Sequence, residues 1–189
     1  MAFALPSGVL LGMVNAWQYF NGGLRFPFLK PVLDGPVRPF YGVYAYPSPL
    51  THFELLIEWL EQHQRPKSAL DLGTGCGVIS LILSRISGVE EVVASDVSPN
   101  AVYGATEEFK RHNLDIEVVQ SDLFEGLKGR RFDLVVFNPP WLPLPEDDGR
   151  RSVMDGGNFY PKDLFPRSLD SHSVNALHCR RHVVCVMAL

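Results

Sequence analysis

The chain has 189 residues, of which 46% are hydrophobic and 20% charged, and its formal net charge is −4. These values predict one soluble globular domain, and the overall acidity does not indicate a nucleic-acid-binding protein. The three cysteines include no C-x-x-C pair, which disfavours a disulfide framework and favours a reducing compartment. The first basic residue is Arg25, so the charged segments of signal and transit peptides are missing, and the apolar run over residues 8–17 is too short to span a membrane. We therefore expect a cytoplasmic protein with no membrane contact.

Residues 1–50 are rich in proline, glycine and aromatic residues. Short extended runs flank a turn signal at Asp34-Gly35, so we expect an N-terminal arm or hairpin that leads into the domain. The sequence leaves open whether this arm only packs against the domain or also recognises a substrate.

The following residues alternate between helix and strand patterns. A helix over 51–64, with Thr51 as its N-cap and Pro66 after its end, carries four apolar residues on one face: Phe53, Leu56, Ile57 and Leu60. Further helices are expected at 77–87 and 98–113, and buried strands at 68–73, 91–96, 116–122 and 132–138. Ser98 and Pro99 supply the cap and first residue of the third helix. This alternation predicts an α/β fold with a doubly wound, mostly parallel, Rossmann-like sheet in a core domain over 51–168.

The pattern weakens after residue 150. A short helix is expected near residue 165, and HVVCVMAL (182–189) is a candidate final strand, but residues 169–189 otherwise predict a divergent tail. We expect the sheet to be incomplete in its C-terminal half, because of truncation or alternative coding. The strand over 132–138 would then lie at or near an exposed edge. No metal site is expected, since these residues lack the spacing of zinc ligands: His178, Cys179, His182 and Cys185.

The loop DLGTGCG (71–77) stands where the first strand turns into a helix. Glycines at alternate positions let the backbone turn sharply and approach a ligand closely, with helix N–H groups directed at it. The spacing is G-x-G-x-G rather than the G-x-G-x-x-G of dinucleotide-binding sites, and no Walker lysine follows. The loop therefore indicates a cofactor without a pyrophosphate.

Polar residues end the next three predicted strands, namely Asp96, Asp122 and Asn138. The carboxyl ends of parallel strands meet at one edge of the sheet, where open α/β sheets bind ligands. Asp96 is placed to accept hydrogen bonds from both hydroxyls of a ribose, and Asp122 to reach or border an adenine. Each aspartate alone would be an ordinary cap or turn residue. Their succession along the chain makes coincidence a poor explanation.

Four stretches, ALDLGTGCG, VVASDVSPNAV, VVQSDLF and FDLVVFNPPW, resemble the class I S-adenosylmethionine-dependent methyltransferases over about residues 65–145. The Asn-Pro-Pro-aromatic ending resembles the amino-group methyltransferases, above all the HemK-like release-factor glutamine methyltransferases, alongside the small-domain RNA methyltransferases. Two flanking stretches, YPSPLTHFELL and GRRSVMDGG, are also similar to the HemK-like pattern. That class normally has seven strands, whereas this chain predicts four and a candidate fifth.

The resemblance implies S-adenosylmethionine as the cofactor and assigns its contacts to these residues: Asp71, Gly73, Thr74, Gly75, Cys76, Gly77, Asp96, Asp122, Leu123 and Asn138. It assigns the methyl acceptor to Asn138, Pro139, Pro140 and Trp141. The last position is usually tyrosine, sometimes phenylalanine, in the family, so Trp141 is a departure. The implied partners are a protein substrate, such as a release factor, or RNA.

An amide or adenine amino nitrogen is a weak nucleophile because its lone pair is delocalised. The Asn138 side-chain oxygen and the Pro139 carbonyl would orient its N–H groups and stabilise the positive charge that develops on nitrogen. The prolines would fix that carbonyl, and the Trp141 indole offers a flat stacking face. We expect an N-methyltransferase acting on a protein glutamine. The alternatives are transfer to an adenine or guanine amino group in RNA or DNA, and a non-catalytic cofactor-binding fragment. A nucleotide-dependent oxidoreductase is disfavoured by the glycine spacing.

Overall fold

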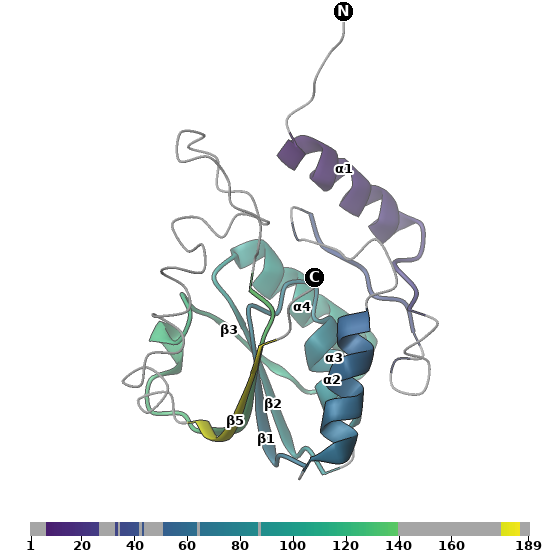
Figure 1. Ribbon diagram of the computed structural model, residues 1–189. Coiled ribbons are helices and arrows are strands. Elements are labelled where there is room, and N and C mark those ends of the chain that lie inside the picture. The colour runs from purple at the N-terminus through teal and green to yellow at the C-terminus, as the bar shows by residue number, and fades with distance from the viewer. Residues whose placement is uncertain are drawn as a thin grey trace, which may run out of the picture.

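A computed structural model describes residues 7–26, 33, 35–41, 43, 51–63, 65–86, 88–139 and 179–185 of the chain, with the side chains of 7–12, 51–52 and 179–185 outside the description. The helices are α1 (Ser7–Phe20), α2 (Thr51–Gln62), α3 (Val78–Arg85) and α4 (Pro99–Arg111), with a short 3₁₀ helix η2 (Glu125–Leu127). The strands are β1 (Ser68–Leu72), β2 (Glu91–Asp96), β3 (Glu117–Gln120), β4 (Phe132–Phe137) and β5 (Cys179–Cys185). Figure 1 shows these elements in place.

The strands form one parallel sheet in the order β3-β2-β1-β4-β5. The predicted α/β fold with a parallel sheet is thus confirmed. β1 is central: its Leu70 is paired with Val93 of β2 on one side and with Val135 of β4 on the other. Because all strands run the same way, their carboxyl ends share one edge, which we call the carboxyl edge.

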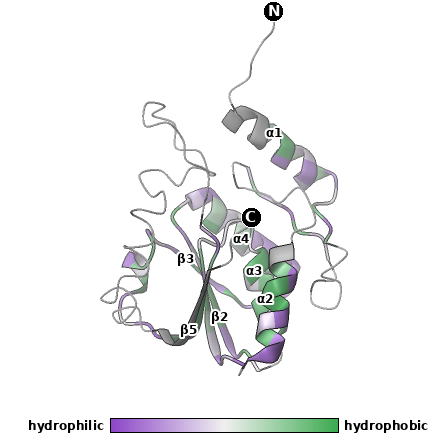
Figure 2. Cartoon of the chain, in the orientation of Figure 1, coloured by the Kyte–Doolittle hydropathy of each residue, from purple (hydrophilic) through white to green (hydrophobic). Residues whose placement is uncertain are grey.

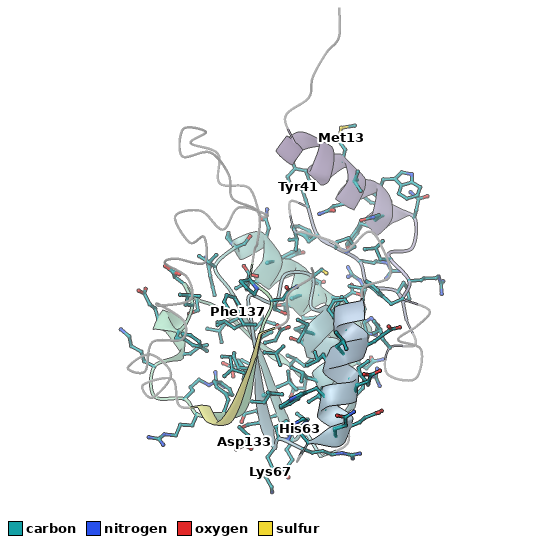
Figure 3. The ribbon with its side chains drawn as sticks, in the orientation of Figure 1. Met13, Tyr41, His63, Lys67, Asp133 and Phe137 are labelled. Atoms are coloured by element: carbon teal, nitrogen blue, oxygen red, sulfur yellow. The ribbon has the colours of Figure 1, made fainter. Side chains whose placement is uncertain are left out.

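A polar contact at the opposite edge fixes the register of β1 against β4. The Asp133 carboxylate accepts hydrogen bonds from the backbone N–H groups of Lys67 (2.9 Å) and Ser68 (3.3 Å). In return the Ser68 hydroxyl accepts one from the backbone N–H of Asp133 (3.1 Å). Figure 3 shows Lys67 and Asp133 at the bottom of the sheet and Phe137, the last residue of β4, above them. The two strands therefore start and end at matching levels.

β5 shows that β4 is not itself the edge of the sheet, although β4 lies next to the edge strand and thus near the edge, as expected. β5 pairs in parallel with β4, matching Val135 with Val183 and Phe137 with Cys185. The final strand expected within 182–189 is confirmed in part, although it begins earlier, at Cys179. The physical reason is that an apolar strand presents a row of unpaired N–H and C=O groups, and the β-branched run in β5 supplies partners for them. Residues 179–185 of the expected divergent tail thus belong to the sheet.

Two apolar clusters cover the two faces of the sheet. On one face, β-strand residues such as Ala94 and Val136 pack against α2, α3 and α4. On the other face, residues such as Leu70 and Val135 pack with Leu127 of η2. Figure 1 shows α2, α3 and α4 on the same side of the sheet, and Figure 2 shows α3 as mostly hydrophobic, whereas α2 alternates. Strands buried on both faces explain their continuous apolar sequences.

The predicted helix boundaries agree with the structure in the core domain. α2 begins at Thr51 and buries three of the four expected apolar residues almost fully, with the fourth half-buried: Phe53, Leu56, Leu60 and Ile57. α4 begins at Pro99 with Ser98 as N-cap, whose side chain accepts a hydrogen bond from the Ala101 N–H at 3.4 Å. The start of α4 thus agrees with the predicted cap at Ser98 and first residue at Pro99.

The N-terminal arm contains a helix that the sequence analysis missed. α1 precedes an antiparallel bridge between Leu24 and Val37, whose two backbone hydrogen bonds are 2.7 and 2.8 Å long. This bridge agrees with the expected hairpin, but the predicted turn residue Asp34 lies outside the described residues. Among the helices of the described part, none is long and apolar enough to cross a membrane.

Candidate functional site

The glycine loop joins β1 to α3 at the carboxyl edge. The N–H groups of Gly73 and Thr74 both donate to the Ser95 carbonyl, at 2.8 and 2.9 Å, so the loop folds over the end of β2. Gly73, Gly75 and Gly77 have φ values of 72°, 55° and 87°, a region that favours glycine. A Cβ at Gly77 would lie 2.8 Å from Cε1 of Phe109, whereas one at Gly75 would meet no atom of the described residues within 4 Å. Gly77 is thus needed for packing, and Gly75 borders open space.

The buried carboxylate of Asp71 stabilises the glycine loop through hydrogen bonds. Its Oδ2 accepts hydrogen bonds from Thr74 Oγ1 (2.7 Å), Ser80 Oγ (2.6 Å) and the Ser80 backbone N–H (2.9 Å). Its Oδ1 is buried and has no hydrogen-bond partner among the described residues. Burial raises the pKa of Asp71 to about 6, and the hydrogen bonds from Ser80 and Thr74 oppose that rise. A buried acid with one unsatisfied oxygen therefore lies directly beneath the loop.

The side chains of Thr74 and Cys76 face the interior. Thr74 is buried and bonded to Asp71, and Cys76 is buried in the core beside α3. Burial raises the pKa of the Cys76 thiol to about 12, so the thiol stays protonated and is no nucleophile. Any contact that these two residues make with a ligand at the exposed side of the loop must come from their backbone.

Asp96 connects the loop to the start of α4. Its Oδ2 accepts a hydrogen bond from the Gly75 N–H and its Oδ1 one from the Ser98 N–H, both at 2.9 Å. Burial raises the pKa of Asp96, and these backbone hydrogen bonds oppose the rise. The half-buried carboxylate thus lies beside the open space at Gly75. It keeps lone pairs that can accept further hydrogen bonds from a ligand.

Asp122 and Leu123 follow β3 in a tight turn. The Ser121 hydroxyl donates to the Leu123 carbonyl and accepts from the Gly126 N–H, both at 2.8 Å, and Leu123 has a φ of 49°. Both Asp122 and Leu123 are partly buried. Val97, a large apolar residue that is exposed directly after Asp96, was not among the predicted site residues. An apolar residue immediately after the acidic end of a strand was the signal that could have identified it.

The register of β1 and β4 brings Asn138 beside the glycine loop. Leu72 and Phe137, the last residues of the two strands, are paired, so Gly73 and Asn138 leave neighbouring strands at the same level. The Phe137 ring lies under the loop, 3.4 Å from the position of a Cβ on Gly73. Asn138 is partly buried and Pro139 is buried. Pro140 and Trp141 lie outside the described residues, so their predicted roles stay predictions.

The chain is similar in sequence to known methyltransferases. Residues 37–146, more than half of the chain, match the family model described as methyltransferase small domain. The release factor glutamine methyltransferase of Deinococcus radiodurans is 39% identical over 102 residues, which cover 53% of this chain and 36% of that protein. The ribosomal RNA small subunit methyltransferase C of Serratia proteamaculans is 31% identical over 108 residues, which cover 57% of this chain and 30% of that protein. The chain spans less than half the length of the curated relatives it matches.

A solved methyltransferase from Pyrococcus furiosus is similar with a TM-score of 0.54 at 16% identity, over 92% of this chain and 76% of that one, which shows a shared fold. The geometry of the described residues fits a nucleoside that carries a cation. Asp96 offers acceptors for ribose hydroxyls beside the open space at Gly75, and the unsatisfied oxygen of Asp71 adds negative charge beneath the loop.

Proposed function

The chain belongs to the methyltransferase small domain family, and from this premise we propose that it uses S-adenosylmethionine to methylate the amide nitrogen of a protein glutamine. The observation that carries the proposal is the pairing of Leu72 with Phe137. It sets the glycine loop and Asn138 on adjacent strands at one level, so that a methyl donor and a planar acceptor can lie side by side. The name of the Deinococcus radiodurans relative supports glutamine as the acceptor.

The residues of the chain provide binding and orientation. S-adenosylmethionine supplies a methyl group bonded to a positively charged sulfur. We propose that Asp96 accepts hydrogen bonds from its ribose, that the backbone at Gly73 and Gly75 lies against it, and that Val97 and Leu123 border its adenine. Asp96 already holds the Gly75 N–H at 2.9 Å, so its carboxylate is positioned before any ligand arrives.

On the acceptor side, the Asn138 side-chain oxygen and the Pro139 carbonyl accept hydrogen bonds from the two amide N–H groups. This holds the nitrogen in line with the methyl group and stabilises the positive charge that builds on it. The nitrogen forms the new bond to carbon as the bond to sulfur breaks, and it then releases one proton to solvent. No strong base is required. A cytoplasmic location, which would suit a substrate that takes part in translation, is part of this proposal.

The second candidate is methyl transfer to an adenine or guanine amino group of RNA. It is favoured by the name of the Serratia proteamaculans relative, and such a base also presents a planar NH₂ group. The acidic net charge of −4 favours the protein substrate, since RNA binding draws on lysine and arginine.

The test begins with calorimetric titration of S-adenosylmethionine into the purified chain. Transfer of radiolabelled methyl is then measured on a purified release factor and on ribosomal RNA, with the Asn138→Ala and Asn138→Asp variants. We expect Asn138→Ala to keep cofactor affinity within about twofold while transfer falls roughly 100-fold, the order seen when one transition-state hydrogen bond is removed. Asn138→Asp keeps an acceptor oxygen and should retain more transfer. Full turnover by Asn138→Ala contradicts the proposal, and cofactor binding without transfer to either substrate indicates a non-catalytic fragment.

A further inference from the structure

Helix α1 is anchored to the core through its polar residues. The fully buried Asn15 donates from Nδ2 to the Phe40 carbonyl at 3.0 Å and also to the Val43 carbonyl. Tyr19 accepts a hydrogen bond from Arg111 of α4 at 2.6 Å, and the guanidinium carbon of Arg111 lies 5.1 Å from the Tyr19 ring centre. These contacts tie α1 to residues 40 and 43 and to α4, and breaking them would leave the buried Asn15 NH₂ group without its acceptors.

The opposite face of α1 turns large apolar side chains to solvent. Met13, Trp17 and Phe20 are 58%, 67% and 83% exposed. Their spacing of four and three residues aligns them on one side of the helix, away from Asn15. We call these three residues the α1 stripe. Single exposed apolar residues are ordinary, but a contiguous row on an anchored helix marks an interaction surface.

The α1 stripe lies on the side of the molecule that holds the candidate site. Phe40, whose carbonyl Asn15 binds, also contacts α4, since its ring lies 4.9 Å from that of Tyr103. The neighbouring Tyr41 carbonyl accepts a hydrogen bond from Asn100 at 3.2 Å. Asn100 is in the first turn of α4, which starts where β2 ends, next to Asp96. In Figure 3, Met13 and Tyr41 lie beyond the Phe137 end of β4, opposite Lys67 and Asp133. A partner bound at the site can therefore extend onto α1.

The chemistry of α1 favours a protein partner. Its 14 residues, SGVLLGMVNAWQYF, include no lysine, arginine, aspartate or glutamate. A nucleic acid would need cations to neutralise its phosphates, and a helix that lies on a membrane normally carries lysine or arginine on its polar face. Aromatic and methionine side chains are instead those enriched in protein interfaces.

The size of the α1 stripe favours a transient partner over a second copy of the chain. At these exposures its three side chains offer roughly 420 Å², given about 200 Å² for each large side chain. A stable interface buries about 800 Å² on each partner, so the stripe alone is too small for a lasting dimer. It is of a suitable size to extend a contact that is already made at the active site. We propose that the α1 stripe docks the protein that carries the acceptor glutamine, an inference that rests on the proposed function.

The test compares the double variant Trp17→Ser/Phe20→Ser with the control Leu55→Ser, which alters an equally exposed apolar residue, 61% exposed, on α2. Methyl-transfer kinetics are measured on a whole release factor and on a short peptide that carries the acceptor glutamine, together with calorimetric affinity for S-adenosylmethionine. We expect KM for the release factor to rise at least tenfold, about 1.4 kcal/mol, in the double variant only. The kcat, the peptide KM and the cofactor affinity should stay unchanged.

An unchanged KM for the release factor in the double variant overturns the docking proposal, and so does an equal loss on protein and peptide. A wild-type dimer in sedimentation that the double variant abolishes assigns the stripe to a second copy instead. Stripe-dependent binding to anionic lipid vesicles or to ribosomal RNA likewise overturns it. If the wild-type chain methylates neither protein nor peptide, the proposed function fails. Direct binding of the release factor then decides the docking question: binding that depends on Trp17 and Phe20 supports the surface, and absence of such binding rejects it.

Discussion

Replacing Asp71 by asparagine removes a buried negative charge while keeping the shape of the side chain. The asparagine oxygen can take the place of Oδ2 and accept the three hydrogen bonds from Thr74 and Ser80. Its NH₂ group then takes the place of Oδ1, which has no partner among the described residues. An unsatisfied buried NH₂ costs about 1–3 kcal/mol, a term that does not vary with pH. The contribution of the Asp71 charge to the free energy of unfolding, by contrast, does vary with pH.

The size and sign of the pH effect follow from the shift in pKa. Burial raises the pKa of Asp71 from 3.8 to about 6, and each unit corresponds to about 1.4 kcal/mol, so the shift amounts to about 3 kcal/mol. Because the folded state holds the proton more tightly than the unfolded state, this contribution to stability is fully present below about pH 4. It is lost as the pH rises through about 6. In Asp71→Asn there is no such loss.

The free energy of unfolding is measured for both proteins by urea titration at pH 4, 5, 6 and 7.5. Taking the difference between the two proteins cancels groups that titrate in the same range without interacting with Asp71, such as Glu117, whose pKa the Arg130 hydrogen bond lowers. We expect this difference to move by about 2.5 kcal/mol in favour of the variant between pH 4 and pH 7.5, slightly less than the full shift because the unfolded state is still partly protonated at pH 4. Parallel pH profiles, within about 0.5 kcal/mol, would refute the reasoning that burial of an ionised Asp71 destabilises the fold.

Two further predictions concern the loop and the sheet. Gly77→Ala combines a positive φ with a clash against Phe109, so we expect a loss of about 2–4 kcal/mol in the free energy of unfolding. Gly75→Ala meets no neighbour among the described residues and should cost only about 1 kcal/mol in the free energy of unfolding. Its methyl group enters the proposed cofactor space, however, so calorimetry should show at least a tenfold weaker affinity for S-adenosylmethionine. In β5, N–H groups of successive residues point to opposite sides, so only one of Val183→Pro and Val184→Pro removes a donor to β4. That variant should unfold at lower urea and aggregate by light scattering; equal behaviour of the pair contradicts the observed pairing.

The core domain was predictable because its signals are local. The cap at Ser98 and Pro99, the apolar face of α2 and the short apolar strands each follow from residues a few positions apart. The position of Asn138 beside the glycine loop was also predictable, since it follows from parallel strands that end at one edge. Periodicity and strand order together were enough for this part of the site.

The missed features depend on contacts between residues far apart in sequence. α1 is held by Asn15, bonded to carbonyls at Phe40 and Val43, and by Tyr19, bonded to Arg111. Its apolar residues face outward, so the usual rule that the apolar face of a helix is buried gives no help. β5 has a recognisable apolar run, but its pairing with β4 joins strands with a long intervening stretch, and no local signal identifies the partner.

The glycine loop shows why residues of one motif need different explanations. The side chains of Asp71 and Thr74 bond to each other inside the protein, while the exposed side of the loop is formed by glycine backbone. The shape of the surface that a ligand would contact on that exposed side is therefore determined by buried side-chain contacts inside the protein. The same loop is held from both sides of β1, by the Ser95 carbonyl of β2 and by the Phe137 ring of β4. Phe137 directly precedes Asn138. A shift of the loop that moves Phe137 would therefore also move Asn138, the residue proposed to bind the acceptor. The loop proposed to bind the methyl donor and the residue proposed to bind the acceptor are therefore both positioned by Phe137. A substitution of Phe137 should change both cofactor affinity and the rate of methyl transfer.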